Sequence, residues 1–137
     1  MSARRWQVRP TETPRLTDLR AAARIAVMVL ESAILDVRAG ESEAFEAAFL
    51  EAQQIISASS GYQRHELRRC VETEDRYLLL VWWETLESHT TGFRQSPEFQ
   101  RWRELLHHFY EPFPTVEHYV GVPGCPNGLA EGGTDSE

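Results

Sequence analysis

The chain has 137 residues, enough for one domain with a hydrophobic core and too few for two comfortable ones. Its formal net charge of −7 argues against nucleic acid as the main partner, because phosphate binding requires a basic face. No run approaches about 18 consecutive apolar residues, so we expect no membrane partner. The scattered Cys70 and Cys125 predict a reducing, cytoplasmic location.

The first 27 residues predict no stable element. They hold six Arg, Pro10 and Pro14 but no lasting apolar period, so we expect residues 1–27 to form a disordered basic N-terminal arm. Met28 opens the first strongly patterned segment, and a true start of the protein at Met28 is an equal alternative. We expect the folded domain to span residues 28–122 and the Gly- and Pro-rich residues 123–137 to form a flexible C-terminal tail.

A strand and a helix are predicted at the start of the domain. Alternation over Val29–Val37 predicts a strand, and one of its faces carries Val29, Glu31, Ala33, Leu35 and Val37. Ser42 is the expected N-cap of the helix after this strand, and Gly61 suits a left-handed position at the end of that helix. The apolar residues at helical spacing are Phe45, Phe49, Ala52 and Ile56.

Two strands of opposite character are predicted next. Tyr62–Glu72 is polar on both faces, which is typical of a sheet edge or a subunit rim. Tyr77–Glu84 is apolar on both faces and includes Trp82 and Trp83, which point in opposite directions. Because each Trp can bury about 150–250 Å², we expect cover on both faces of this strand. Helices would cover one face and a second copy of the protein the other, so we predict a homodimer.

The remaining pattern completes the fold. Thr85–Arg94 predicts a short helix, and Ser96-Pro97-Glu98 predicts the start of another. Thr115–Val122 predicts the last strand. The resulting order, β-α-β-β-α-β, predicts an α+β, ferredoxin-like fold whose antiparallel sheet has helices on one face.

The chain resembles a known family from residue 28 to residue 122. The run Val81-Trp82-Trp83-Glu84, the segment Phe93–Phe99 around Ser96-Pro97 and the final strand with Val116-Glu117-His118-Tyr119 are similar to the antibiotic biosynthesis monooxygenase domain. The resemblance implies a dimeric α+β barrel. It also implies oxidation of a small aromatic, phenol- or quinol-like metabolite by molecular oxygen, with no metal or other cofactor, in a dry pocket between sheet and helices.

Part of the family's residue pattern is absent. Quinone-forming and haem-degrading members use an Asn on a strand, whereas the one Asn of this chain is Asn127. Ser32 stands roughly where the haem-degrading members place that Asn, and Phe93 replaces a His found in many relatives. These departures argue against haem degradation. A single Glu104-x-x-His107 lacks the second copy that a di-iron site requires, so no metal site is expected.

Seven residues are candidates for the site. His65 and His118 are candidate bases and Ser32 a candidate donor, while the substrate-binding candidates are Trp82, Trp83, Phe93 and Arg94. Each has a plainer interpretation: His65 as a rim residue, His118 as a structural histidine, the Trp residues as core and Arg94 as a solvated helix end. Two other functions stay open, namely a non-catalytic binding or dimerisation module and an isomerase or lyase that uses the same pocket.

Overall fold

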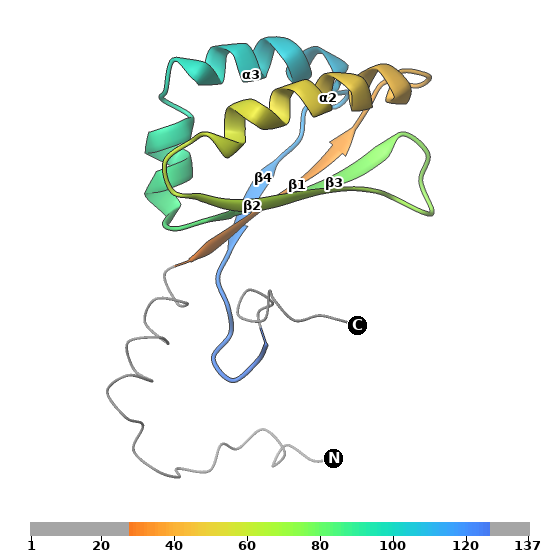
Figure 1. Ribbon diagram of the computed structural model, residues 1–137. Helices are drawn as coiled ribbons and strands as arrows, with labels where there is room; N and C mark the ends of the chain where they lie inside the picture. The colour runs from red at the N-terminus through yellow and green to blue at the C-terminus, as the bar shows by residue number, and fades with distance from the viewer. Residues whose placement is uncertain (1–27, 127–137) are drawn as a thin grey trace, which may run out of the picture.

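The computed structural model describes residues 28–126, so the predictions for the arm 1–27 and for most of the tail lie outside the described residues (Figure 1). The elements follow the predicted order. They are β1 (Val29–Asp36), α2 (Ser42–Ser57), β2 (Tyr62–Arg69), β3 (Arg76–Trp83), the π-helix η2 (Ser88–Phe93), α3 (Glu98–Leu106), the 3-10 helix η3 (His107–Phe109) and β4 (Val116–Tyr119). No helix in this part of the chain combines the length and the apolarity that a membrane crossing requires.

The four strands form one antiparallel sheet in the order β2-β3-β1-β4. Figure 1 shows α2 and α3 together on one face of this sheet, so the predicted α+β, ferredoxin-like fold is confirmed. The polar strand β2 lies at an edge, as its sequence predicted, and the apolar strand β3 lies inside the sheet. The sheet of a single chain is open and does not close into a barrel.

The strand register separates two faces of the sheet. Opposite one another on the helix-covered face are Val29 and Trp83, Glu31 and Val81, Ala33 and Leu79, and Leu35 and Tyr77. All eight of these side chains are buried. The open face, which no described element covers, carries Leu30, Ser32, Ile34, Leu78, Leu80 and Trp82. Half of the Ile34 surface is exposed there, at 50%.

An aromatic core joins α2 to the sheet. Phe45 of α2 is fully buried, and its ring centroid lies 4.9 Å from Tyr77, 5.7 Å from Phe109 and 6.0 Å from Tyr110. Tilted and edge-on ring pairs at these distances stabilise a core beyond the area that they bury. The far end of the same helix face, at Ile56, lines the pocket described below.

Of two local predictions, the N-cap at Ser42 is wrong and the left-handed conformation at Gly61 is confirmed. Ser42 begins α2 but does not cap it, because its hydroxyl donates to the Oδ1 of Asp75 at 2.5 Å instead. Gly61 does adopt a left-handed conformation, with φ +86°, and a Cβ at this position would clash with the side chain of Ser88. A side chain at residue 61 would therefore displace the start of η2.

The segment predicted as a short helix over Thr85–Arg94 is a π-helix, η2. The N–H of Arg94 donates to the carbonyl of His89 at 3.0 Å, which is the i to i+5 pattern of wider winding. His89 and Phe93, four residues apart, lie on one face of this segment and point inward, where 3% and 2% of their surfaces are exposed. Single-turn π-helices are frequent at functional sites, and the candidate site of this protein begins here.

Candidate functional site

A buried carboxyl group lies at the centre of the site. Glu31 of β1 points toward the helices among apolar neighbours and is 6% exposed. The indole Nε1 of Trp83 donates to its Oε1 at 2.9 Å. Burial raises the pKa of Glu31 to about 7, although the Trp83 hydrogen bond and the charge of Arg94 act in the opposite direction. Glu31 can therefore release and accept a proton near neutral pH.

His89 of η2 lies against this carboxyl group. Its Nε2 is 3.5 Å from the Oε1 of Glu31, and its ring stacks on Trp83 with centroids 5.3 Å apart and planes at 18°. The Nδ1 of His89 lies 2.9 Å from the Nε2 of His118 on β4. Burial, followed by the charges of Arg94 and His118, lowers the pKa of His89 to about 3. The His89 ring is consequently neutral at physiological pH and carries one proton, on the nitrogen beside Glu31 or on the nitrogen beside His118.

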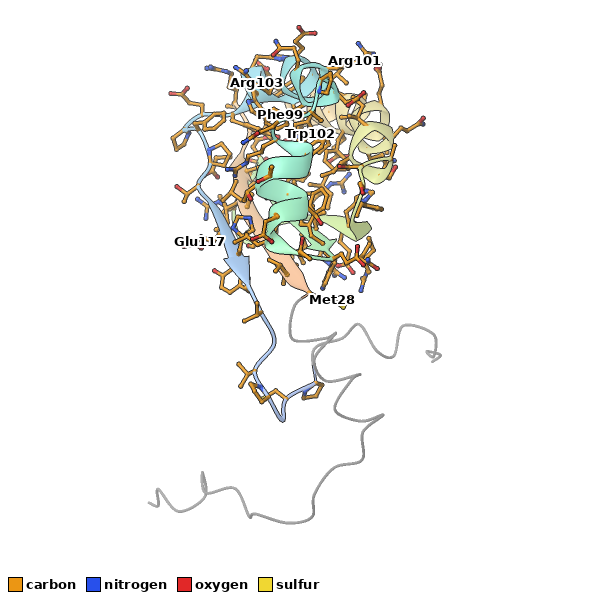
Figure 2. All side chains as sticks on the ribbon, turned by 90° about the vertical axis from the view of Figure 1, so that its left-hand side faces the viewer. Met28, Phe99, Arg101, Trp102, Arg103 and Glu117 are labelled. Atoms are coloured by element: carbon orange, nitrogen blue, oxygen red, sulfur yellow. The ribbon has the colours of Figure 1, made fainter. Side chains whose placement is uncertain are left out.

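A cavity of about 320 Å³ opens beside Glu31 and His89. This volume is at the small end of the range for ligand pockets and suits a compact molecule. Its aromatic wall consists of Phe93, Phe99, Trp102, His107, Tyr110 and Phe113. Figure 2 shows Phe99 and Trp102 on the side of α3 that faces the body of the protein, with Arg101 and Arg103 on the other side. The pocket is thus lined by flat, apolar surfaces with one titrating carboxyl group.

The other titratable groups of the wall are held neutral. Burial, together with the charge of Arg103, lowers the pKa of His107 to about 4. Burial and the nearby Glu31 raise the pKa of the Tyr110 hydroxyl. Neither residue changes its charge near pH 7, so proton exchange at neutral pH falls to Glu31.

Arg94 supplies the positive charge at the pocket. It is exposed, lines the cavity directly after η2, and makes no ion pair with any residue in the range 28–126. Its charge lowers the pKa of Glu31, His89 and His118. The guanidinium is therefore close enough to act on the site and remains available to an anionic ligand.

The structure brings four of the seven candidates to this site. Phe93 and Arg94 line the pocket, His118 contacts His89, and Trp83 holds Glu31. Trp83 is fully buried and does not line the pocket. Its role is to hold the Glu31 carboxyl group in place through the indole N–H.

Two candidates lie on the opposite face of the sheet. Ser32 follows Glu31 along β1, and because side chains alternate along a strand it points to the open face, away from the cavity. For the same reason Trp82 points away from the pocket, where the guanidinium of Arg64 lies 4.0 Å from its ring centroid. Neither Ser32 nor Trp82 can contact a molecule in the pocket of its own chain, so the expectation of a pocket role is corrected for both.

His65 lies on the helix-covered face but in a different place. Its Nε2 is 2.8 Å from the Oε1 of Gln53, and its Nδ1 shares a hydrogen bond with the hydroxyl of Tyr62. It lines a separate groove between α2 and β2, and it is absent from the wall of the cavity at Glu31. His65 is therefore not placed to act on a molecule in the cavity at Glu31, because β3 separates its strand β2 from β1.

Glu31 and His89 are the site residues that the sequence did not reveal. Glu31 gave a signal, since it is the one acid on the otherwise apolar face of the first strand. His89 gave a weaker signal, since it stands four residues before Phe93, a spacing that places both side chains on one face of a helix. Among residues 28–126, no group of three His, Cys, Asp or Glu side chains is placed to hold a metal ion.

The sequence profile of the antibiotic biosynthesis monooxygenases matches residues 28–105. The chain belongs to this family. YczJ of Bacillus subtilis (strain 168), an uncharacterised protein, is 55% identical over 95 residues, which make up 69% of this chain and 100% of the relative. The predicted family resemblance is therefore confirmed.

Solved structures agree with this membership. A protein of Bordetella bronchiseptica assigned to the antibiotic biosynthesis monooxygenases is 35% identical, with a TM-score of 0.67 over 70% of this chain and 98% of its own. SnoaB, a cofactor-independent oxygenase from Streptomyces nogalater, is 21% identical, with a TM-score of 0.55 over 74% of this chain and 97% of its own. At the latter identity the likeness is one of fold alone.

Proposed function

We propose that this member of the antibiotic biosynthesis monooxygenase family oxidises a small phenol or hydroquinone with molecular oxygen, without a metal or organic cofactor. The observation that carries the proposal is Glu31, a carboxyl group with a pKa of about 7 inside an aromatic pocket. A general base is most effective when its pKa lies near the working pH. The aromatic wall provides stacking surfaces for a flat substrate and excludes water.

The chemistry balances without another reagent. The substrate hydroxyl gives its proton to the Glu31 carboxylate, and the phenolate passes one electron to dioxygen. The radical pair then forms a carbon–oxygen bond at a ring carbon that carries a hydrogen, opposite the hydroxyl in a phenol and beside it in a hydroquinone. The peroxide takes the proton back and loses water, so one oxygen atom stays in the quinone and the other leaves as water.

Arg94 has a supporting role in this scheme. A phenolate in a dry pocket is costly unless a donor or a positive charge lies beside it. Arg94 lines the pocket and has no ion-pair partner among the described residues, so its guanidinium is free to approach the phenolate oxygen. The same charge lowers the pKa of Glu31 and so keeps more of it ionised and able to accept a proton.

We also propose that two copies associate through the open face of the sheet. This face carries the apolar side chains of Leu30, Ile34, Leu78, Leu80 and Trp82 with no described element over them. An antiparallel sheet that faced water on this side would show polar residues at these positions. A second copy supplies the matching apolar surface by two-fold symmetry.

We expect Leu80→Glu to dissociate this dimer. Each interface would gain two buried charges, and burial costs several kcal/mol per ion, so the dimer Kd should rise by at least about 100-fold. Analytical ultracentrifugation of the full chain at micromolar concentration measures the change. Leu50→Glu is the matched control, because Leu50 is 63% exposed on the outer side of α2. A monomeric wild-type protein in this experiment would refute the proposed dimer.

Proton transfer without oxygen is the second candidate function. The adjacent Glu31 and His89 could move a proton within an isomerase or lyase substrate, and the cavity would serve equally well. A non-catalytic binding module would use the cavity alone. The three functions differ in what happens to oxygen and to the ligand.

A parallel screen separates them. Phenols and hydroquinones are tested for oxygen uptake at an electrode and for thermal stabilisation of the protein, with a chelator present throughout. We expect at least one compound to stabilise the protein and to be consumed with oxygen. Stabilisation without uptake would indicate a binding module, and turnover that continues under argon would indicate an isomerase or lyase.

A further inference from the structure

Three titratable side chains form a continuous line from the pocket to the edge of the sheet. Glu31 lies on the pocket wall, and its Oε1 is 3.5 Å from the Nε2 of His89. The Nδ1 of the same imidazole is 2.9 Å from the Nε2 of His118. His89 thus contacts one partner with each of its two nitrogens, which is the arrangement that allows an imidazole to accept a proton on one side and release one on the other.

The outer end of the line reaches solvent. His118 lies on β4, the edge strand of the sheet beside β1, directly opposite Glu31 in the strand register (Figure 1). It is partly exposed, whereas Glu31 and His89 are 6% and 3% exposed. Water can therefore reach His118 at a place that is separate from the cavity, because His118 is not part of the cavity wall.

We infer that Glu31, His89 and His118 form a proton path between the pocket and solvent, with His118 as the positioning residue that connects the buried pair to water. The inference rests on the proposed function, since it assigns a route for the proton that Glu31 exchanges. Such a path is needed once the substrate is bound. A substrate that fills a cavity of about 320 Å³ also blocks the pocket as an entrance for water, so Glu31 needs another route to reach its ionised form.

The proton transfer conserves every proton. The O–H bond of protonated Glu31 breaks as an N–H bond forms at the Nε2 of His89. The proton on the Nδ1 of His89 passes to the Nε2 of His118, and the proton on the Nδ1 of His118 passes to water. Glu31 ends as a carboxylate that accepts a hydrogen bond from His89. The reverse sequence returns a proton to Glu31 and restores both tautomers.

The surroundings of the path keep its two imidazole rings neutral. The groups that face the path are Glu31 from β1, Trp83 from β3, His89 and Arg94 from and after η2, Tyr110 after η3 and His118 from β4. Burial and Arg94 lower the pKa values of both histidines. Both rings therefore stay neutral near pH 7, so neither traps the proton as a stable imidazolium ion.

His118→Gln tests the path in the full-length protein without substrate. Gln keeps a polar side chain at the position but cannot pass a proton from one atom to another. In 15N-histidine-labelled protein, NMR should show a scalar coupling between the Nδ1 of His89 and the Nε2 of His118. Exchange of the His89 ring proton with water should slow by about tenfold or more in the variant. His108→Gln, at an exposed histidine outside the path, should leave this exchange unchanged.

Each alternative has its own outcome. If His118 only supports the fold, its replacement loosens the site and the exchange becomes faster, which is the opposite sign. An unchanged rate, or the absence of the coupling in wild-type protein, would also overturn the path. Because no substrate is needed, these results do not depend on the proposed oxidation. If a phenol is oxidised, the variant should in addition lose kcat at saturating substrate more than kcat/KM, with a shifted pH profile.

Discussion

Replacement of Glu31 by Gln is expected to lower the rate of oxygen uptake by about 10²- to 10⁴-fold, the usual contribution of a general base. The Gln side chain has nearly the same shape, and its amide oxygen can still accept the hydrogen bond from Trp83 that Glu31 Oε1 receives at 2.9 Å. The pocket should therefore stay intact while the proton acceptor is lost.

The measurement is the initial rate of uptake with whichever phenol or hydroquinone the wild-type protein oxidises best. Glu51→Gln is the matched control, because the Glu51 side chain is 57% exposed and pairs with Arg101 on the surface. A Glu31→Gln variant that retains the wild-type rate would show that another group removes the proton, with His89 as the next candidate base.

The same variant changes how stability depends on pH. The folded pKa of Glu31 is about 7, raised from 4.5, so its contribution is fully present below pH 4.5 and is lost as the pH rises through 7. A difference of this size corresponds to about 3 kcal/mol between the two limits. Relative to wild type, Glu31→Gln should therefore gain up to about 3 kcal/mol of unfolding free energy between pH 4.5 and 8.

Denaturant unfolding at several pH values measures this difference. The comparison between the two proteins is needed because His89 acts in the opposite sense. Its pKa is lowered from 6.5 to about 3, so its contribution is present above pH 6.5 and is lost as the pH falls through 3. A parallel pH dependence in both proteins would mean that Glu31 titrates normally in the folded state.

Trp83→Phe is expected to destabilise the protein by about 1–3 kcal/mol, because it leaves a buried acceptor without its donor. The ring remains available to stack on His89, but the indole N–H to Glu31 is gone. Since that hydrogen bond lowers the pKa of Glu31, its loss should move the pKa above 7 and shift the pH at which oxygen uptake is half-maximal upward.

Trp82→Phe is the control for this change. This variant removes the same atoms at the neighbouring residue, but the Trp82 side chain lies on the open face beside Arg64. We expect it to leave the pH profile in place. An equal shift in both variants would show that the effect comes from the general stability of β3.

The fold was largely predictable because it depends on residue alternation and local signals. The polar residues of Tyr62–Glu72 predicted an edge strand, and the order of strands and helices predicted the ferredoxin-like sheet. The errors are local. The Ser42 hydroxyl donates a hydrogen bond to Asp75, which is distant in the sequence. Ser42 therefore does not cap the helix.

The site was only partly predictable because it depends on which face of the sheet the helices cover. Ser32 and Glu31 are neighbours in the chain, and the register decides that Glu31 meets the pocket while Ser32 does not. His65 shares the covered face but lies one strand too far away. The spacing places His89 on one helix face with Phe93, but its contact with Glu31 depends on how η2 packs against the sheet.

The winding of η2 makes the chemistry sensitive to chain length. A π-helix holds one residue more per turn than the α-helix into which a deletion would convert it. Removing one residue between Ser88 and Phe93 would rotate the residues before the deletion by about 100° relative to the residues after it. His89 and Phe93 would still share a face of the helix, but that face would turn relative to the chain on one side of the deletion. Homologues that are one residue shorter here should thus share this architecture and yet lack the imidazole–carboxyl contact, even where every side chain of the strands is retained.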